Sequence, residues 1–330
     1  MNLTDSVTPL HVVLAAAVLI CAIAALYTPR RLTGVVLFLV FGVFLSSYWA
    51  VLGAADVALA EAVIGTGVTG ALFGYVATVL PQPGPSDPSA NTTGASPART
   101  STTGRTVVGI LGGAGLGAGL AHLLSLAAPE SSGLSEPVAH AMPSTGVEHP
   151  ITGVLLNLRS YDTLMEMVVL LAAVAVALAF LRDPHARLPR AEHQPSPLVK
   201  LYVTIVAPVA LLLAAWLLFA GSSQPGGAFQ SGAALAAVVI LLQSSGVRRF
   251  VVGPAMISVL LIGVVAFLTV AVGGLVLGDA WLFLRGPWAG TITIALETAL
   301  AVSIGAGLGV IFLATTVDRQ PHGREVAPDA

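Results

Sequence analysis

The chain has 330 residues, of which 56% are hydrophobic and only 9% are charged. Soluble domains carry about 25% charged residues, so this composition excludes a soluble globular protein and predicts an all-α polytopic membrane protein. The formal net charge of −2 offers no basic face for phosphates and argues against nucleic-acid binding. The single cysteine, Cys21, excludes an internal disulfide and a cysteine-based metal site.

The N-terminal part of the chain reads as a three-helix membrane module over residues 1–80. Apolar runs at 11–28, 32–52 and 57–80 are each long enough to span a bilayer. Residues 1–26 lack the basic region of a signal peptide, since Asp5 is their only Asp, Glu, Lys or Arg. We therefore expect the first run to be a retained span.

Two carboxylates, Asp56 and Glu61, lie at the start of the third run. An ionisable side chain at a helix centre costs about 2.5–3.5 kcal/mol on insertion scales and suggests a function by default. Residues five apart on an α-helix diverge by about 140°, so the two need not face one partner. Glu61 is deeper and is the better candidate for moving cations or protons.

Residues 81–105 are rich in Pro, Ser and Thr and predict a flexible linker. The fourth span, 106–127, repeats glycine at every fourth position without forming a strict dinucleotide-binding motif. This small-xxx-small pattern predicts close helix packing, and the pairs Gly70/Gly74 and Gly305/Gly309 repeat it. His122, near the end of this span, is either a proton relay or a packing residue.

The fifth span, 162–181, completes a two-helix module over 106–183 and begins in the stretch LNLRSYDTLMEM. Asp162 and Glu166 are four residues apart and share one helix face, to which Arg159 also belongs. Arg159 and Asp162 lie near an aqueous edge, where pairing alone explains them equally well. Glu166 lies deeper and is a candidate ion-path residue.

A polar, proline-broken segment, 184–199, predicts a cytoplasmic linker to a four-helix module over 200–330. Pro225, Gly226 and Gly227 predict a turn between the first two helices of this module. The expected spans are 200–220, 227–243, 254–278 and 289–315.

The basic residues predict the orientation of the nine spans. An external N-terminus places twelve of the fourteen Lys and Arg residues on the cytoplasmic side and only Arg159 and Arg285 outside, as the positive-inside rule requires. The cytoplasmic set is Arg30, Arg31, Arg99, Arg105, Arg182, Arg187, Arg190, Lys200, Arg248, Arg249, Arg319 and Arg324. The C-terminus is then cytoplasmic.

In this orientation the ionisable side chains within the spans lie in the outer half of the membrane. Glu297, in the ninth span, joins Glu61 and Glu166 as a deep carboxylate suited to moving cations or protons. The sequence contains no HExxH motif, no Cys/His cluster and no nucleophile elbow. It therefore predicts no enzyme active site, no metal centre and no cofactor.

Three stretches resemble subunits of Mrp-type cation/proton antiporters and related membrane-bound hydrogenases. GAADVALAEAVIGTGVTGALF is similar to their short three-span module, and ITGVLLNLRSYDTLMEMVVLLAAVAVALAFLR to the two-span module that follows it. SPLVKLYVTIVAPVALLLAAWLLFAGSSQPGGAFQSGAALAAVVILL resembles the antiporter B subunit. The matching motif residues are Asp56, Glu61, Arg159, Asp162 and Glu166, with Pro225, Gly226, Gly227, Phe229 and Gly232 at the B-subunit turn.

Two positions depart from the pattern of that family. Asn157 stands where an aspartate is expected, and Ala228 replaces a third glycine. The resemblance implies an accessory subunit of a multisubunit Na⁺/proton antiporter in a prokaryotic cell (inner) membrane, docked on larger proton-translocating subunits. It implies that Na⁺, H⁺, lipid and those subunits are its partners. The single lysine, Lys200, argues against transport by this chain alone.

Two other interpretations stay open on the sequence alone. The same kind of subunit would also serve a hydrogenase-like or inorganic-carbon-uptake complex driven by another reaction. A purely structural scaffold, whose carboxylates only pair internally, is the third possibility. A free-standing carrier is disfavoured because no inverted repeat with paired interrupted helices is visible.

Overall fold

A computed structural model of the chain describes residues 8–79, 102–126, 133–181, 186–187, 196–248, 250, 252–277, 281, 284, 286–315 and 318–319. These residues are almost entirely helical, apart from β1 (Ala186–Arg187) and β2 (Asp318–Arg319), which form a short antiparallel pair. The chain divides into two compact units, one of residues 1–80 with 138–330 and one of residues 81–137.

The long helices are apolar along most of their length. They are α1 (Pro9–Tyr27), α2 (Arg31–Val51), α5 (Thr102–Leu126), α8 (Ser160–Leu181), α9 (Pro197–Ala220), α10 (Ala228–Ser244), α11 (Pro254–Leu277) and α12 (Ala289–Thr315). A further long rod joins α3 (Ala55–Ala60), the π-helical segment η2 (Glu61–Val68) and α4 (Thr69–Val79). The short helices are α6 (Ser135–Ala141), η3 (Met142–Ser144), α7 (Pro150–Gly153) and the π-helical η4 (Val154–Leu158).

Each of the nine predicted spans corresponds to a helix, and the all-α membrane fold is confirmed. Seven helices among the described residues are long and apolar enough to cross a membrane. The other two apolar stretches, Gly109–Leu123 of α5 and Ala228–Ser244, are shorter. The count of nine spans and the external N-terminus stay predictions.

Parts of the predicted linkers lie outside the described residues. Of the segment 81–105, only residues 102–105 are described, and they form the first turn of α5. Of the segment 184–199, the described residues are β1 and the start of α9, which Ser196 caps by accepting a hydrogen bond from the Val199 N–H. Arg99, Arg182, Arg190, Arg249, Arg285 and Arg324 also lie outside the described residues.

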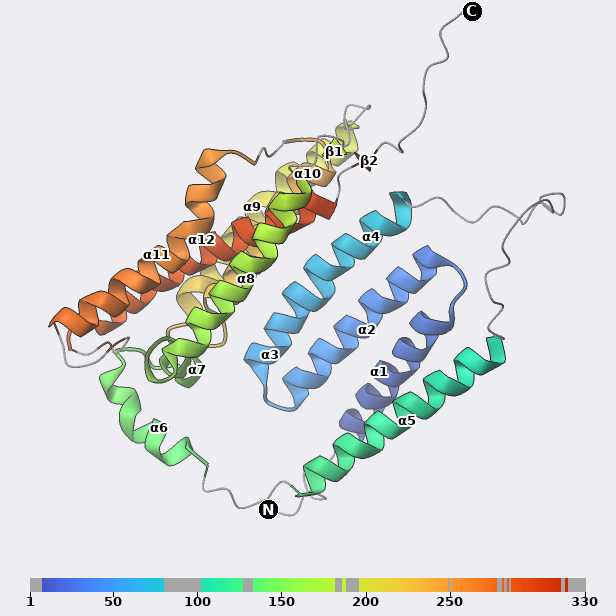
Figure 1. Cartoon of the computed structure of the whole chain (residues 1–330), viewed down its shortest axis with the longest axis horizontal. Helices are drawn as coiled ribbons and strands as arrows, with labels where there is room; N and C mark the ends of the chain where they lie inside the picture. The colour runs from blue at the N-terminus through green and yellow to red at the C-terminus, as the bar shows by residue number, and fades with distance from the viewer. Residues whose placement is uncertain are drawn as a thin grey trace, which may run out of the picture. The chain divides into compact units, whose positions relative to one another are not determined.

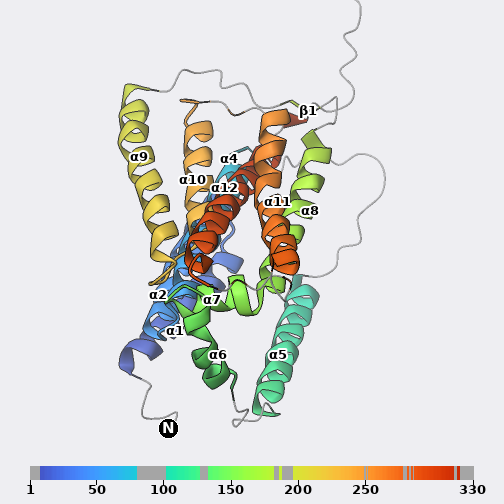
Figure 2. The same ribbon diagram turned by 90° about the vertical axis from the view of Figure 1, so that its left-hand side faces the viewer.

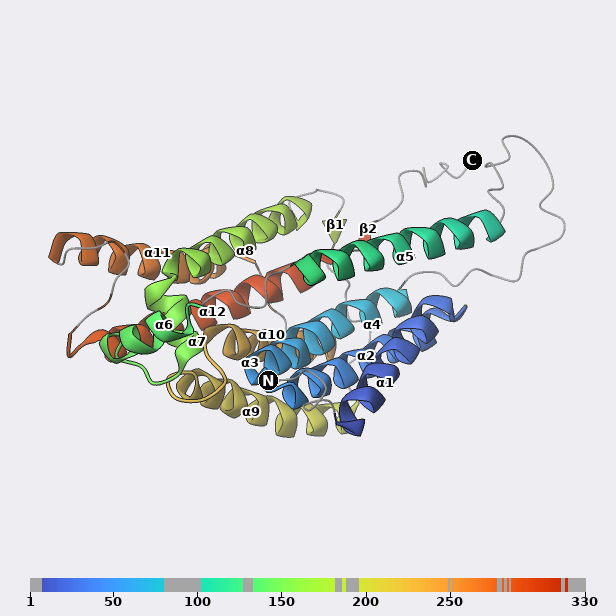
Figure 3. The ribbon, with the colours of Figure 1, turned by 90° about the horizontal axis from the view of Figure 1, so that it is seen from below.

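Within the larger unit, α12 is the central helix. It contacts α8, α9, α10 and α11, and Figure 2 shows α9 and α10 on one side of it and α11 and α8 on the other. Fourteen residues of α12 are buried, whereas α1 has none. Figure 1 shows α1, α2 and the α3–α4 rod side by side, and Figure 3 shows the same row from below.

The α3–α4 rod attaches this row of helices to the rest of the unit. Val68 packs in a cluster with Ala236, Ile240 and Phe312, and the Tyr75 ring meets the Phe312 ring edge-on at a centroid distance of 6.1 Å. Burial of such apolar surface stabilises by about 25 cal/mol per Å² when the alternative is water. In lipid, close packing itself provides the attraction.

Glycines allow the close approach of α10 and α12. A Cβ at Gly232 would lie 2.7 Å from Ile304 Cβ, and one at Gly305 would lie 2.8 Å from Leu235 Cβ. Gly309 faces Val239 in the same way. The small-residue repeat at Gly305 and Gly309 is therefore a packing motif, as predicted from the sequence.

We predict that Gly305→Ala lowers the free energy of unfolding by about 1–3 kcal/mol, the usual cost of overpacking. The added methyl group would meet Leu235 and the Gly232 carbonyl of α10. Denaturant titration of the purified protein in mixed micelles measures this change. Gly273→Ala, in α11, is the matched control because its methyl group would meet no atom within 4 Å. Equal stability of the two variants would contradict the packing role.

Candidate functional site

The turn between α9 and α10 is where the candidate site is built. Gly227, the residue before α10, has φ = 108°, which lies in the region that favours glycine. Its N–H donates to the Leu217 carbonyl at 2.8 Å, and its own carbonyl accepts from the Ser231 N–H at 3.0 Å. The predicted Pro225-Gly226-Gly227 turn is thus present and begins α10.

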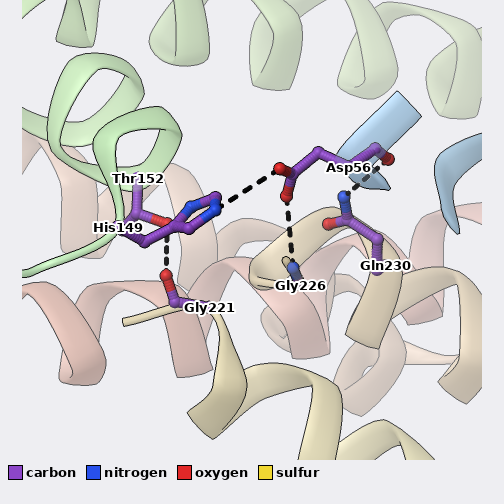
Figure 4. A network of polar contacts seen from close by, with 6 residues as sticks. All are labelled: Asp56, His149, Thr152, Gly221, Gly226 and Gln230. Atoms are coloured by element: carbon purple, nitrogen blue, oxygen red, sulfur yellow. Dashed lines mark hydrogen bonds and ion pairs between the residues drawn. The ribbon is translucent and has the colours of Figure 1, made fainter. Parts of the chain in front are cut away.

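Asp56 connects the first module to this turn. Its Oδ1 accepts a hydrogen bond from the Gly226 N–H at 3.2 Å, across 170 residues of sequence. The Gln230 side-chain amide donates to the Asp56 backbone carbonyl at 3.4 Å. Figure 4 shows the Asp56 side chain pointing toward Gly226 of the turn, with Gln230 of α10 beside it.

His149 approaches Asp56 from the segment before α7. Its Nε2 lies 3.5 Å from Asp56 Oδ2, an ion-pair distance when the imidazole is protonated, and both side chains are largely enclosed, at 12% and 19% exposed. Its Nδ1 is buried and has no hydrogen-bond partner within the described part of the chain. Sequence reasoning assigned no role to His149, because nothing in the local sequence links it to Asp56.

The same segment also bonds to the backbone of the α9–α10 turn. Thr152 Oγ1 donates to the Gly221 carbonyl at 2.5 Å, as Figure 4 shows. The N–H groups of Glu148 and His149 donate to the Ser222 carbonyl at 2.9 and 3.0 Å. Groups from two other parts of the sequence, Asp56 and residues 148–152, therefore bond to one short turn.

Glu297, about two helical turns into α12, also contacts this turn. It is 2% exposed, and it accepts a hydrogen bond from the Ala228 N–H at the start of α10. A Cβ at Gly227 would lie 2.9 Å from Glu297 Oε1. Its Oε2 is buried and has no hydrogen-bond partner among the described residues. Burying a carboxylate with one oxygen unpaired is costly, so this geometry fits a functional residue, and the role of Glu297 in an ion path stays a prediction.

Glu61 opens the π-helical segment η2, which the sequence did not predict. Its half-buried side chain lies over Gly65, where an added methyl group would collide with the carboxylate. The Thr66 hydroxyl of η2 is buried without a partner in the described residues, and it packs against Gly42 of α2. π-Helical segments often occur at functional sites.

Arg159, Asp162 and Glu166 lie around the start of α8. Arg159 pairs with Asp162 at 2.6 Å, and both side chains are well exposed, at 65% and 45%. Exposed pairs contribute at most about 1 kcal/mol, which favours the pairing interpretation for these two residues. Glu166 is exposed on α8 between the exposed side chains of Met165 and Val169.

The structure thus brings Asp56 and Glu297 to one turn but leaves other candidates outside this cluster. His122 is an exposed residue of α5, in the other compact unit, so its role stays a prediction. Asn157, at the position where the family pattern has an aspartate, is 4% exposed and donates from Nδ2 to the Leu284 carbonyl at 2.8 Å. Within the described residues no group of three His, Cys, Asp or Glu side chains could hold a metal ion.

Two family models match the chain. Residues 16–82 match MbhD, a family of MBH subunits, and residues 198–316 match the domain related to the MnhB subunit of Na⁺/H⁺ antiporter. The chain thus combines an MbhD-like region with an MnhB-like region. The contact between Asp56 and Gly226 joins these two regions.

A solved structure shares the fold of the protein. A chain of the Mrp complex from Dietzia sp. DQ12-45-1b matches it with a TM-score of 0.71 and 21% sequence identity. The match covers 96% of the present protein and 35% of that chain, so the protein spans about a third of the length of the chain it matches. A comparison with curated proteins finds no match.

We predict that Gly227→Ala destabilises the protein by more than Gly53→Ala. Both glycines have positive φ, 108° and 79°, and both variants incur backbone strain of about 1–3 kcal/mol. Only at Gly227 would the new methyl group also meet the Glu297 carboxylate, because nothing lies within 4 Å of a Cβ at Gly53. The free energies of unfolding, measured side by side in mixed micelles, give the difference. An equal loss of unfolding free energy in the two variants would show that Gly227 does not pack closely against the Glu297 carboxylate.

We predict that Asn157→Asp, which restores the residue typical of the family, lowers the free energy of unfolding by about 1–3 kcal/mol. The Asn157 amide donates to the buried Leu284 carbonyl, and a carboxylate in its place would present an acceptor to an acceptor. Asp162→Asn, the opposite change at a side chain 45% exposed, should cost at most about 1 kcal/mol. A neutral or stabilising Asn157→Asp would overturn this account of the departure.

Proposed function

We propose that the chain is an accessory membrane subunit of a multisubunit monovalent cation (Na⁺)/proton antiporter, contributing Glu61, Glu166 and Glu297 to an ion path. The observation that carries this proposal is Glu297, a carboxylate 2% exposed in the central apolar helix with one oxygen left without a partner in the described residues. A carboxylate buried in an apolar helix is energetically costly, and such groups commonly serve the binding or transfer of a positive charge. The MnhB-related family match supplies the antiporter context.

The other two carboxylates suit the same path in different ways. Glu61 lies at the first residue of a π-helical segment, where the backbone departs from regular α-helix. Glu166 is exposed on an otherwise apolar helix face, next to Met165 at 57% and Val169 at 66% exposed. A carboxylate facing lipid would be costly, so this face suits a partner subunit or a water-filled path.

The proposed partners follow from the exposed apolar helices and from the Mrp complex that the chain resembles in fold. α1 contributes no buried residue, and α8 exposes one apolar face. We infer that larger proton-translocating subunits and lipid cover these surfaces in a prokaryotic cell membrane, and that Na⁺ and H⁺ are the transported ions. Asp56, Asp162, Arg159 and His122 would then line or position parts of the path.

A second candidate is the same kind of subunit in a hydrogenase-like complex, which the match of residues 16–82 to the MbhD family favours. The genes next to this one separate the two candidates. Hydrogenase or electron-carrier-binding subunits encoded there would favour a redox-driven complex, whereas a complete antiporter set alone would favour exchange. A structural scaffold is the third alternative, and the Arg159–Asp162 pair fits it.

We predict that Glu297→Gln, made in the whole complex, abolishes most Na⁺-driven exchange without loss of assembly. The amide keeps an oxygen for the Ala228 N–H but cannot carry the charge that exchange requires. Na⁺-dependent dissipation of an imposed pH gradient in everted vesicles is the readout, with subunit assembly checked on the same membranes. Glu166→Gln, measured in the same assay, tests whether the exposed carboxylate of Glu166 is also required for exchange.

Glu148→Gln is the matched control, since Glu148 is an exposed carboxylate near the same turn whose backbone alone bonds to Ser222. Exchange that survives in an intact Glu297→Gln complex would leave the scaffold interpretation standing. A wild-type complex without any Na⁺-driven exchange would instead favour the reaction-coupled candidate.

A further inference from the structure

His149 and Glu297 are both linked to the turn before α10, Glu297 through Gly227 and Ala228 and His149 through Asp56. We propose that His149 is a positioning residue for Glu297, acting through Asp56 and the Gly226–Ala228 backbone, and that a proton on His149 holds this turn closed over the buried carboxylate. The proposal rests on the proposed role of Glu297 in the ion path, and it adds a residue and a means of control to that role.

The first step is the pair between His149 and Asp56. Nε2 and Oδ2 are 3.5 Å apart, and the two side chains are 12% and 19% exposed, so water screens their attraction only in part. Imidazoles change charge between about pH 5 and 8, whereas carboxylates are ionised over most of that range. Loss of the proton from His149 would leave Asp56 facing a neutral ring.

The second step is the bond from the turn to Asp56. The Gly226 N–H donates to Oδ1, while His149 faces Oδ2 of the same carboxylate. A hydrogen bond to an ionised carboxylate is stronger than one between neutral groups. A positive charge at His149 attracts the Asp56 carboxylate and keeps it beside Gly226, and thereby strengthens the hold on the turn.

The third step leads from the turn to Glu297. Gly226 and Ala228 are separated by Gly227 alone, whose N–H is held by the Leu217 carbonyl and whose Cα faces Glu297 Oε1. Since the Ala228 N–H donates to Glu297, loss of the Gly226 bond removes one of the hydrogen bonds that fix the backbone next to this carboxylate. The three steps form one continuous set of contacts from a titratable ring to a buried acid.

The charged and titratable groups around His149 are few among the described residues. Asp56 faces it from α3, and Glu148 adjoins it in its own segment. Glu297 faces Gly227 from α12. α10 contains no charged residue, and α9 has Lys200 alone, in its first turn and so at the helix end away from the glycine turn. The pairing with Asp56 is therefore the interaction that a proton on His149 would change most.

Hydrogen exchange of the Gly226 amide in the purified complex tests this hold on the turn without any transport measurement. In the wild type, the protection factor, corrected for the intrinsic rate, should be about fivefold higher at pH 6 than at pH 8, which corresponds to about 1 kcal/mol for a partly exposed pair. His149→Gln should remove this difference by holding protection at the pH 8 level. Asp56→Asn should remove it too, and combining the two changes should add nothing further.

The pH profile of exchange is the second readout. Because the closed turn restricts access to Glu297, His149→Gln should raise the Na⁺-driven exchange rate about fivefold at pH 6 and leave the rate at pH 8 unchanged. His11→Gln is the matched control, because His11 bonds to Thr8 at the start of α1 and has no part in this set of contacts.

The outcomes separate this proposal from the proposed function. Unchanged Gly226 protection in His149→Gln at both pH values overturns the role of His149, whatever the transport result. A pH-dependent protection that persists in Asp56→Asn overturns the route through Asp56. If the wild type shows no Na⁺-driven exchange, the proposed function fails, while the protection factors still decide whether His149 holds the turn.

Discussion

The rest of the structure depends on how the backbone N–H and C=O groups of the turn between α9 and α10 find hydrogen-bond partners. Polar main-chain groups are costly to leave unpaired away from water. Here the carbonyls of Gly221 and Ser222 and the N–H of Gly226 bond to residues from two other parts of the chain, Thr152 with its neighbours and Asp56. The hydrogen bonds that satisfy this turn also connect the modules, so a change in the turn would change the contact between the modules.

The central helix α12 makes use of that fixed point. Its glycines bring α10 close enough for the Ala228 N–H, at the helix start, to reach Glu297. The N-terminus of a helix favours a negative charge, which compensates part of the cost of a buried carboxylate. One arrangement therefore explains both the helix packing and the site. The small-residue interface between α10 and α12, together with the glycine turn before α10, places Glu297 in the core.

Sequence patterns predicted the helices, because hydrophobic runs longer than a bilayer is thick leave few alternatives. They also identified the glycine turn, the packing face of α12 and Glu297 as a deep carboxylate. They did not identify His149, Gln230 or the π-helical segment η2, since these depend on contacts between residues far apart in the chain. The surroundings of Glu61 and His122 could not be predicted either, because residue spacing within one helix does not reveal which residues of other helices it contacts.

The π-helical segment has a consequence for the tolerance of this rod to changes in length. A π turn accommodates one residue more than an α turn. A one-residue deletion within Glu61–Val68 can therefore be absorbed by a return to regular α-helix, with little rotation of α3 relative to α4. With α4 anchored by Tyr75 against Phe312, Asp56 would then stay on the side of the rod that faces Gly226. Natural variants of this chain should thus tolerate the loss of one residue along η2 more readily than within a regular helix such as α2, where the same loss rotates the flanking turns by about 100°.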